Sequence, residues 1–379
     1  MSRASDGTCA VIGAGLGGAA LAASMALCGY RVRLHDLNDA RLTDIRDLGG
    51  VEVAGLFQGF AKIELATPHL APAVDGADII AVCTGSSAHA EVARLLAGLL
   101  RDGQTILLVQ GGTGGSLIVR NELARLSCRA RVDVAEVDNY PFALSWPLAT
   151  SMRFTIRKEF LQVAALPAAR GPAVLAKLRA VFPQAVAAPN TLYTGLNNAN
   201  AILHVANMVC NIGRLESGGN DYRFYSEGYT PSAIAALTRV SDERLEVARR
   251  LGVTVPGIHR WLLDTYGLGG DSLAETFQHL THEPTGPYRS TPTPRSMNHK
   301  YVTEDVPCGL VAMSALGQAV GAPTPVIDGL IALSSAMLGR DFAKEGRNLD
   351  ALGLSGQSAD QIKATFERGP ASTAPLAQH

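Results

Sequence analysis

Two groups of residues in this sequence have the types and the spacing that ligand chemistry requires. In the first, residues 13 to 18 read GAGLGG, a G-x-G-x-x-G pattern, and Asp36 follows Gly18 by eighteen positions. Gly13 allows a tight turn, Gly15 lets the backbone approach a pyrophosphate, and Gly18 lets the following helix pack closely on the preceding strand. The acid lies near the distance expected for a residue that holds a ribose hydroxyl. Together these residues predict a dinucleotide site.

The second group is a stripe of polar side chains in the segment 190 to 215, which we expect to form one helix of about seven turns. The stripe consists of Asn197, Asn200, His204, Asn207 and Asn211, with spacings of 3, 4, 3 and 4. This spacing places all five side chains on one face of a helix. Asparagine is a poor helix former, and a surface helix more usually carries Glu and Lys. We therefore interpret the stripe as the hydrogen-bonding wall of a cleft.

The elements around the glycine loop predict how it is positioned. The apolar runs Cys9 to Ile12, Ile79 to Cys83 and Thr105 to Val109 are typical of parallel strands buried on both faces. Ligands of a doubly wound sheet bind beyond the carboxyl ends of its strands. We therefore expect the cofactor to contact Gly13, Ala14, Gly15, Leu16, Gly18, Asp36, Cys83, Thr84 and Gly85. The glycine-rich loop after Thr105 to Val109, residues 110 to 115, is a further candidate contact. Arg153 to Arg157 and Phe160 to Ala165 are expected to form a late hairpin.

Length and composition limit the remaining possibilities. The chain has 379 residues, 47% hydrophobic and 18% charged, with a formal net charge of −1. We expect an α/β N-terminal Rossmann domain with a doubly wound, mainly parallel sheet over residues 1–186, an all-α substrate domain over 187–366 and a tail over 367–379. The charge balance favours neither nucleic acid nor a membrane as partner. Six scattered cysteines and the absence of metal-ligand spacing predict a cytoplasmic protein with reduced thiols and no metal.

The uncharged stretch Val11 to Cys28 has an alternative interpretation as a signal peptide or membrane span. Its crowded glycines, its thin basic flank (Arg3 beside Asp6) and its continuation into Asp36 favour the nucleotide loop instead. A helix N-terminus also accounts physically for the pattern, because its free amides and dipole favour a phosphate.

Three segments together resemble the octopine/nopaline (opine) dehydrogenase family, of the 6-phosphogluconate dehydrogenase-like two-domain type. They are the glycine signature, the set NAILH at 200–204 with FYSEG at 224–228 and DER at 242–244, and the segment KYVTEDVP at 300–307. The resemblance implies a Rossmann domain followed by an all-α domain. It also implies an enzyme that joins an amino acid to a 2-oxo acid and reduces the imine with NADH or NADPH.

By this resemblance His204 is the catalytic acid and base and Asp305 is its paired carboxylate. An imidazole suits both the deprotonation of an ammonium and the loss of water from a carbinolamine. We expect substrate contacts from Lys300 and Tyr301, by the same resemblance, and from Asn200 and Asn207 of the polar stripe. Two structural alternatives stay open: His204 as a satisfied helix histidine, and Asp305 as a helix N-cap before Val306-Pro307.

One position departs from the family pattern, because Lys300 stands where an arginine is expected to clamp a carboxylate. Lysine offers a point charge and no bidentate fork, so the carboxylate is held differently or the substrate differs. Arg289 and Arg295 are candidates to replace the missing guanidinium.

The cofactor and the activity also keep alternatives. Asp36 favours NAD over NADP because its charge repels a 2′-phosphate, whereas Arg31, Arg33 and Arg41 weaken that preference. A ketopantoate reductase-like carbonyl or alcohol oxidoreductase without an amine substrate is the alternative activity, and a non-catalytic nucleotide sensor is a third. The apolar last helices are compatible with a homodimer interface and equally with the core of the second domain.

Overall fold

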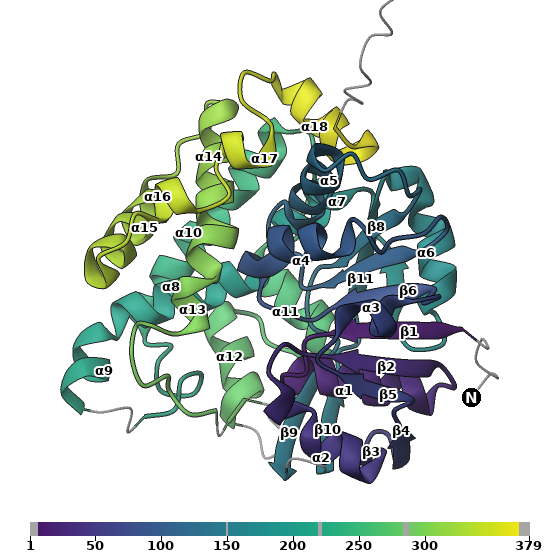
Figure 1. Cartoon of the computed structure of the whole chain (residues 1–379). Coiled ribbons are helices and arrows are strands. Elements are labelled where there is room, and N and C mark those ends of the chain that lie inside the picture. Colours follow the sequence, from purple (N-terminus) through teal and green to yellow (C-terminus); the bar gives the residue numbers. More distant parts are fainter. Residues whose placement is uncertain (1–6, 149–150, 219–221, 283–287, 290, 371–379) are drawn as a thin grey trace, which may run out of the picture.

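The computed structural model describes residues 7–148, 151–218, 222–282, 288–289 and 291–370, and Figure 1 shows a sheet-containing half beside a helical half. The larger sheet has eight strands in the order β12-β11-β8-β7-β6-β1-β2-β5. Every pairing in it is parallel except the antiparallel pair of β8 and β11. Its strands are β1 (Thr8–Ile12), β2 (Arg31–His35), β5 (Leu65–Thr67), β6 (Ile79–Val82), β7 (Thr105–Val109), β8 (Asp133–Val137), β11 (Leu161–Leu166) and β12 (Ala185–Ala187).

The order of the central strands produces a switch point at β1. Strand β2 pairs with one edge of β1 and β6 with the other, so the loops after β1 and β6 leave the sheet side by side. All residues of β1, β6 and β7 are buried, as the apolar runs predicted. The flanking helices are α1 (Leu16–Leu27), α2 (Thr43–Leu48), α3 (Leu70–Val74), α4 (His89–Leu96), α5 (Gly115–Arg125) and α6 (Gly171–Leu178). This is the expected Rossmann-type arrangement.

A second sheet of four strands has the order β4-β3-β10-β9, with β3 (Gly50–Gly55), β4 (Gly59–Lys62), β9 (Phe142–Leu148) and β10 (Ser151–Arg157). It corrects the expectation of a late hairpin, because β10 pairs with β9 and β3 whereas β11 pairs with β8 and β12. The burial patterns give the reason. Strand β11 is buried at every position and suits the middle of the large sheet, whereas β10 alternates and suits a sheet with one exposed face.

The chain after β12 is helical among its described residues apart from one isolated bridge, Arg223 to Pro292. Its helices are α7 (Thr191–Leu196), α8 (Ala199–Cys210), α9 (Ile212–Gly218), α10 (Pro231–Arg250), α11 (Ile258–Tyr266), α12 (Leu273–His282), α13 (Lys300–Thr303), α14 (Val311–Ala319), α15 (Pro325–Leu338), α16 (Phe342–Glu345), α17 (Leu349–Leu352) and α18 (Ala359–Arg368), with a π-helical turn at Val306–Leu310. Within the described residues, no helix has the length and apolarity that a membrane span needs.

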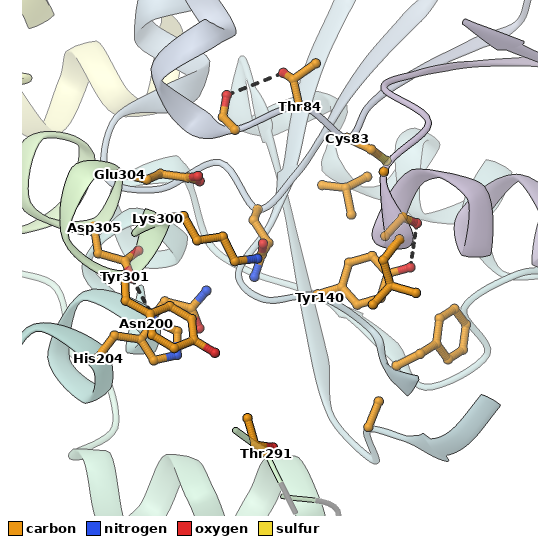
Figure 2. A pocket seen from close by; sticks show the side chains of 18 of the residues that line it. Cys83, Thr84, Tyr140, Asn200, His204, Thr291, Lys300, Tyr301, Glu304 and Asp305 are labelled. Atoms are coloured by element: carbon orange, nitrogen blue, oxygen red, sulfur yellow. Dashed lines mark hydrogen bonds and ion pairs between the residues drawn. The ribbon is translucent and has the colours of Figure 1, made fainter. Parts of the chain in front are cut away.

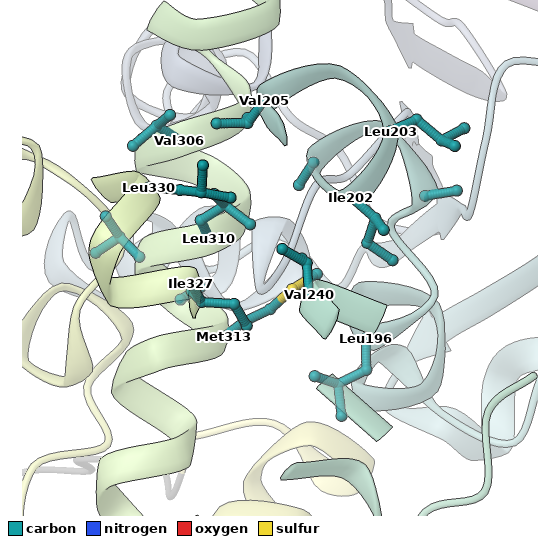
Figure 3. Packing of buried hydrophobic residues seen from close by; sticks show 14 of the residues in the cluster. Leu196, Ile202, Leu203, Val205, Val240, Val306, Leu310, Met313, Ile327 and Leu330 are labelled. Atoms are coloured by element: carbon teal, nitrogen blue, oxygen red, sulfur yellow. The ribbon is translucent and has the colours of Figure 1, made fainter. Parts of the chain in front are cut away.

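The core of the helical half forms around α8, α10, α14 and α15. Figure 3 shows side chains from these helices and from the π-helical turn packed together, among them Ile202, Val240, Leu310, Met313 and Ile327. Each of these five side chains is fully buried. Because α8 packs on this core with one face, its other face is available to the α/β half.

The predicted single helix over 190–215 is wrong: three helices replace it, with breaks at residues 197–198 and at Asn211. The asparagines account for the breaks, because their side chains compete with helical backbone hydrogen bonds. Asn190 caps α7 by accepting from Tyr193 N at 3.0 Å, and Asn197 ends α7 and donates to Asp138 Oδ2 of the α/β half at 2.9 Å. The breaks therefore tie the helical half to the sheet.

Candidate active site

The loop after β1 has the geometry of a pyrophosphate cradle. Gly13 has φ +100°, and a Cβ there would lie 3.1 Å from the Cys83 carbonyl. A Cβ at Gly18 would overlap the Gly13 carbonyl oxygen, so α1 packs on β1 only because residue 18 is glycine. At Gly15, by contrast, an added Cβ would meet open space, and no side chain caps the N-terminus of α1. The open backbone and the free helix amides fit a dinucleotide pyrophosphate.

Asp36 lies directly beside this loop, at the end of β2. Its Oδ2 accepts from Ala14 N at 2.7 Å, and its Oδ1 accepts from Asn38 N at 2.8 Å. Arg41 forms an ion pair with Oδ2 at 3.3 Å and is more than half exposed. The acid is therefore held next to the cradle, as its spacing predicted, with a guanidinium beside it. That Asp36 makes the protein favour NAD over NADP stays a prediction.

A cavity of about 450 Å³ runs between the two halves. Figure 2 shows Cys83, Thr84 and Tyr140 on the side of the α/β half, facing residues of α8 and α13. Ten of the residues selected from the sequence line this one cavity: Gly15, Leu16, Cys83, Thr84, Gly85, Asn200, His204, Lys300, Tyr301 and Asp305. Its size falls within the range of enclosed small-molecule sites. Gly13, Ala14, Gly18 and Asp36 lie behind the lining, where they shape the loop.

The His204 imidazole contacts three side chains in the cavity. Its Nδ1 lies 2.7 Å from Asp305 Oδ2, and its Nε2 lies 2.9 Å from the Tyr225 hydroxyl. The Tyr301 ring stacks on the imidazole at a centroid distance of 3.8 Å and an angle of 21°. The imidazole is only 6% exposed and is thus fixed from three sides. A carboxylate at Nδ1 holds the neutral ring in the tautomer whose Nε2 carries the lone pair, which is the arrangement of a general base.

The backbone around Asp305 explains how it reaches across to α8. Asp305 is helical, at φ −70° and ψ −29°, and its side chain makes no capping hydrogen bond to the π-helical turn that follows. The alternative of an N-cap is therefore excluded, and the carboxylate is free to pair with His204. Single π-helical turns occur often at functional sites, and this one directly follows the residue that pairs with the histidine.

The segment 242–244 does not line the cavity but positions other helices of the helical half. Glu243 accepts from the backbone amides of Val326 and Ile327 at the start of α15, at 2.9 and 3.0 Å. Arg244 is 1% exposed and donates to Leu196 O at 2.8 Å and to Pro256 O at 2.6 Å. Because Leu196 ends α7 just before α8, Arg244 helps to hold the helix that carries His204.

Asn207 is placed differently from the prediction. It is 1% exposed and does not line the cavity, because its amide is engaged within the helical half. Its Nδ2 donates to Phe224 O at 2.9 Å, and its Oδ1 accepts from Asn211 at 2.8 Å. Asn207 thus anchors the segment that carries Tyr225. Of the asparagines in the stripe, only Asn200 is among the residues that line the cavity.

Several residues that line the cavity were not selected from the sequence, among them Tyr225, Tyr140 and Lys158. Tyr225 contacts the His204 imidazole, Tyr140 donates to Gly17 O at 2.7 Å, and Lys158 directly follows β10. Tyr225 falls within the segment 224–228 that carries the family resemblance, which was the available signal. Nothing local marked Lys158. Arg289 and Arg295, the candidates for the missing guanidinium, are exposed and do not line the cavity.

Burial sets the protonation of several lining groups. It raises the pKa of Tyr301 to about 12 and keeps the pKa of Tyr225 well above its usual value, so both hydroxyls stay protonated near neutral pH. Burial likewise raises the pKa of Cys83 far above its usual value, which leaves an inert thiol. Burial lowers the pKa of Lys158 to about 8, although the carboxylate of Asp138 opposes the shift.

Comparisons with known proteins agree with this arrangement. The family model for the NAD/NADP octopine/nopaline dehydrogenase, alpha-helical domain, matches residues 187–338. The opine dehydrogenase of Arthrobacter sp. (strain 1C) is 36% identical over 361 residues, which cover 95% of this chain and 99% of that protein.

Solved structures share the fold. Octopine dehydrogenase in complex with NADH and agmatine superposes with a TM-score of 0.77 at 19% identity, over 95% of this chain and 97% of that one. A PanE/ApbA family ketopantoate reductase from Ralstonia eutropha JMP134 gives a TM-score of 0.60 at 21% identity, over 89% and 99% of the two chains. With 36% identity to the Arthrobacter enzyme over nearly its whole length, this chain belongs to the opine dehydrogenase family, NAD(P)-dependent oxidoreductases that act on CH–NH bonds.

Proposed function

We propose that this protein condenses an amino acid with a 2-oxo acid, reduces the imine to a secondary-amine dicarboxylate, and also catalyses the reverse oxidation. The observation that carries the proposal is the His204–Asp305 pair, 2.7 Å apart, in a cavity that also reaches the glycine loop. An acid and base beside a hydride donor is the combination that imine formation and reduction need. Membership of the opine dehydrogenase family supports the same chemistry.

The proton steps belong to Nε2 of His204. As a neutral base it takes a proton from the ammonium of the amino acid, and the freed amine attacks the carbonyl carbon of the oxo acid. As an acid it returns a proton to the hydroxyl of the carbinolamine, which leaves as water while the C=N bond forms. Asp305 stabilises the imidazolium between these two steps and holds the ring orientation. The Tyr225 hydroxyl, at 2.9 Å from Nε2, occupies the hydrogen-bonding position that the substrate amine takes during the reaction.

The glycine loop, Asp36 and residues 83–85 would hold the nicotinamide cofactor between the two halves. When bound, the reduced nicotinamide supplies the hydride that converts the imine carbon to the secondary amine. Tyr140, which lines the cavity and donates to Gly17 O, holds the glycine loop in place. On the opposite wall, Lys300 points into the cavity next to Tyr301 and offers a cation to a substrate carboxylate (Figure 2).

A two-substrate assay tests this proposal. Oxidation of NADH and of NADPH is followed with pyruvate and other small 2-oxo acids, each with and without a panel of amino acids. The proposal predicts turnover only when both substrates are present. Turnover with the oxo acid alone would replace it with a carbonyl reductase of the ketopantoate reductase type.

A histidine variant separates an enzyme from a nucleotide sensor. His204→Asn should abolish turnover and keep cofactor binding. His259→Asn is the matched control, because His259 contacts Thr276 at 3.0 Å and does not line the cavity. Equal activity of the wild type and His204→Asn would contradict the assignment of the general base.

A further inference from the structure

Lys158 is a buried lysine that has no anionic partner at bonding distance among the described residues. It is 5% exposed, and it lines the cavity. Among the residues that the structure describes, none accepts a hydrogen bond from its ammonium or pairs with it as an ion pair. A buried charge without a hydrogen-bonded partner is costly, so its presence in a ligand cavity calls for an explanation from the ligand.

The backbone holds Lys158 in place from both halves of the protein. Its own amide donates to Pro141 O at 3.0 Å, and the amide of Glu159 donates to Thr265 O in α11 at 2.9 Å. The ammonium lies 5.7 Å from the Trp261 ring centroid and 5.4 Å from that of Tyr266. These contacts stabilise a cation without consuming its hydrogen bonds, so three N–H donors remain for a ligand.

Asp138 is a nearby carboxylate that acts on Lys158 electrostatically, and its oxygens already accept hydrogen bonds from other groups. Its Oδ1 accepts from Gln162 N and Asn139 Nδ2, both at 3.0 Å, and its Oδ2 accepts from Asn197 Nδ2 at 2.9 Å. Burial of Asp138 raises its pKa to about 6, which its amide donors and Lys158 moderate. With a lowered pKa of about 8, Lys158 is still mostly protonated at pH 7.

A row of aromatic residues leads from His204 toward Lys158 and indicates which substrate Lys158 contacts. From His204 the row continues through Tyr225 to Tyr288, whose ring centroids lie 4.7 Å apart, and the Tyr288 hydroxyl bonds to that of Tyr266 at 2.8 Å. The Lys158 ammonium, over the Tyr266 ring, is thus at the other end of this row of aromatic rings from the imidazole. The carbonyl of the oxo acid must stay beside His204 and the hydride donor. The part of the cavity toward Lys158 is left for the amine partner.

We infer that Lys158 is the carboxylate-binding residue for the amino-acid substrate, while Lys300 serves the 2-oxo acid. This inference rests on the proposed function and extends it. The dicarboxylate product has two carboxylates, and the cavity is lined by two lysines and by no arginine among the described residues. The carboxylate at Lys158 comes from one of two sources, the α-carboxylate common to all amino acids or a carboxylate in the side chain.

Substitution of Lys158 by methionine keeps the length and removes the charge. For Lys158→Met we expect the KM for the amino acid to rise about 10- to 100-fold, the loss of one charge-assisted hydrogen bond in a buried site. The KM values for pyruvate and for the cofactor should change by less than about twofold. Lys158→Arg should recover most of the amino-acid affinity. The control is Lys177→Met, because Lys177 bonds to Thr105 and Gly103 away from the cavity.

Three amines identify the source of the carboxylate: L-alanine, L-glutamate and ethylamine. If Lys158 binds the α-carboxylate, the variant loses affinity for alanine and glutamate alike and approaches the wild type's affinity for ethylamine. If it binds a side-chain carboxylate, only glutamate loses affinity. Unchanged KM values for both amino acids, or a rise confined to pyruvate, would overturn the inference.

Calorimetric titration of L-alanine and L-glutamate into the NAD⁺ or NADP⁺ complex separates this inference from the proposed function. A wild type that binds neither amino acid and shows no turnover with any amino acid of the panel refutes both. A wild type and a Lys158→Met variant that bind them equally refute only the role of Lys158. Should the single variant fail to fold, Lys158→Met with Asp138→Asn removes the buried carboxylate together with its compensating charge, and the same comparison is made there.

Discussion

The hydrogen bond between Asp305 and His204 makes a prediction whose size can be worked out. Asp305→Asn keeps the shape of the side chain and removes the charge that faces Nδ1 at 2.7 Å. With an amide N–H toward Nδ1, the neutral ring must carry its proton on Nε2 and cannot accept one from the ammonium. The corresponding change in a serine protease triad lowers kcat by about 10,000-fold. We expect a loss of about 1,000- to 10,000-fold, or about 4 to 5.5 kcal/mol in the barrier.

The assay compares kcat for the paired substrates with the cofactor affinity measured by fluorescence titration. The affinity should be unchanged, because Asp305 lies in the helical half and its partner is His204. Asp328→Asn is the matched control: its carboxylate accepts from the Ser314 hydroxyl at 2.6 Å in the same half, and it does not line the cavity. A kcat for Asp305→Asn within tenfold of the wild type would refute the tautomer argument.

Three further predictions concern the cofactor loop and the contact between the halves. Asp36→Ser should shift the ratio of the Kd values for NADH and NADPH about tenfold in favour of NADPH, because Arg41 then faces a 2′-phosphate without a competing carboxylate. An unchanged ratio of the two Kd values would contradict the role assigned to Asp36. Gly18→Ala should lower the free energy of unfolding by about 1–3 kcal/mol and weaken cofactor binding, because the new methyl group overlaps Gly13 O. A urea titration that gives the same free energy of unfolding for the variant and the wild type would contradict this prediction. Arg347→Met should cost about 3 kcal/mol in unfolding free energy, because Arg347 is 5% exposed and donates to three backbone carbonyls of the α/β half at 2.6–2.9 Å; a cost below about 1 kcal/mol would contradict that role.

The sheet around the glycine loop could be predicted because its signals are local. The apolar runs over 9–12, 79–83 and 105–109 became β1, β6 and β7, and the loops after them meet at the predicted edge. The late hairpin could not be predicted correctly, since β10 and β11 are neighbours in sequence and partners in different sheets. Which strand pairs with which is decided by burial across the whole fold.

The site itself depends on contacts that sequence spacing does not encode. His204 and Asp305 are 101 positions apart, and their association was expected from family resemblance alone. The asparagine stripe predicted a polar wall but also a continuous helix, and the side chains of Asn197 and Asn207 serve the structure instead. Lys158 could not be found in advance, because only the fold brings it to α11.

The fate of deuterium carried on C4 of the reduced nicotinamide would decide whether an imine or a carbonyl accepts the hydride. In a reaction with pyruvate and an amino acid, the proposed chemistry places the label on the carbon that joins the former oxo acid to nitrogen. Mass spectrometry and proton NMR would then find a labelled secondary-amine dicarboxylate. Label in lactate, with the amino acid recovered unchanged, would contradict the proposal.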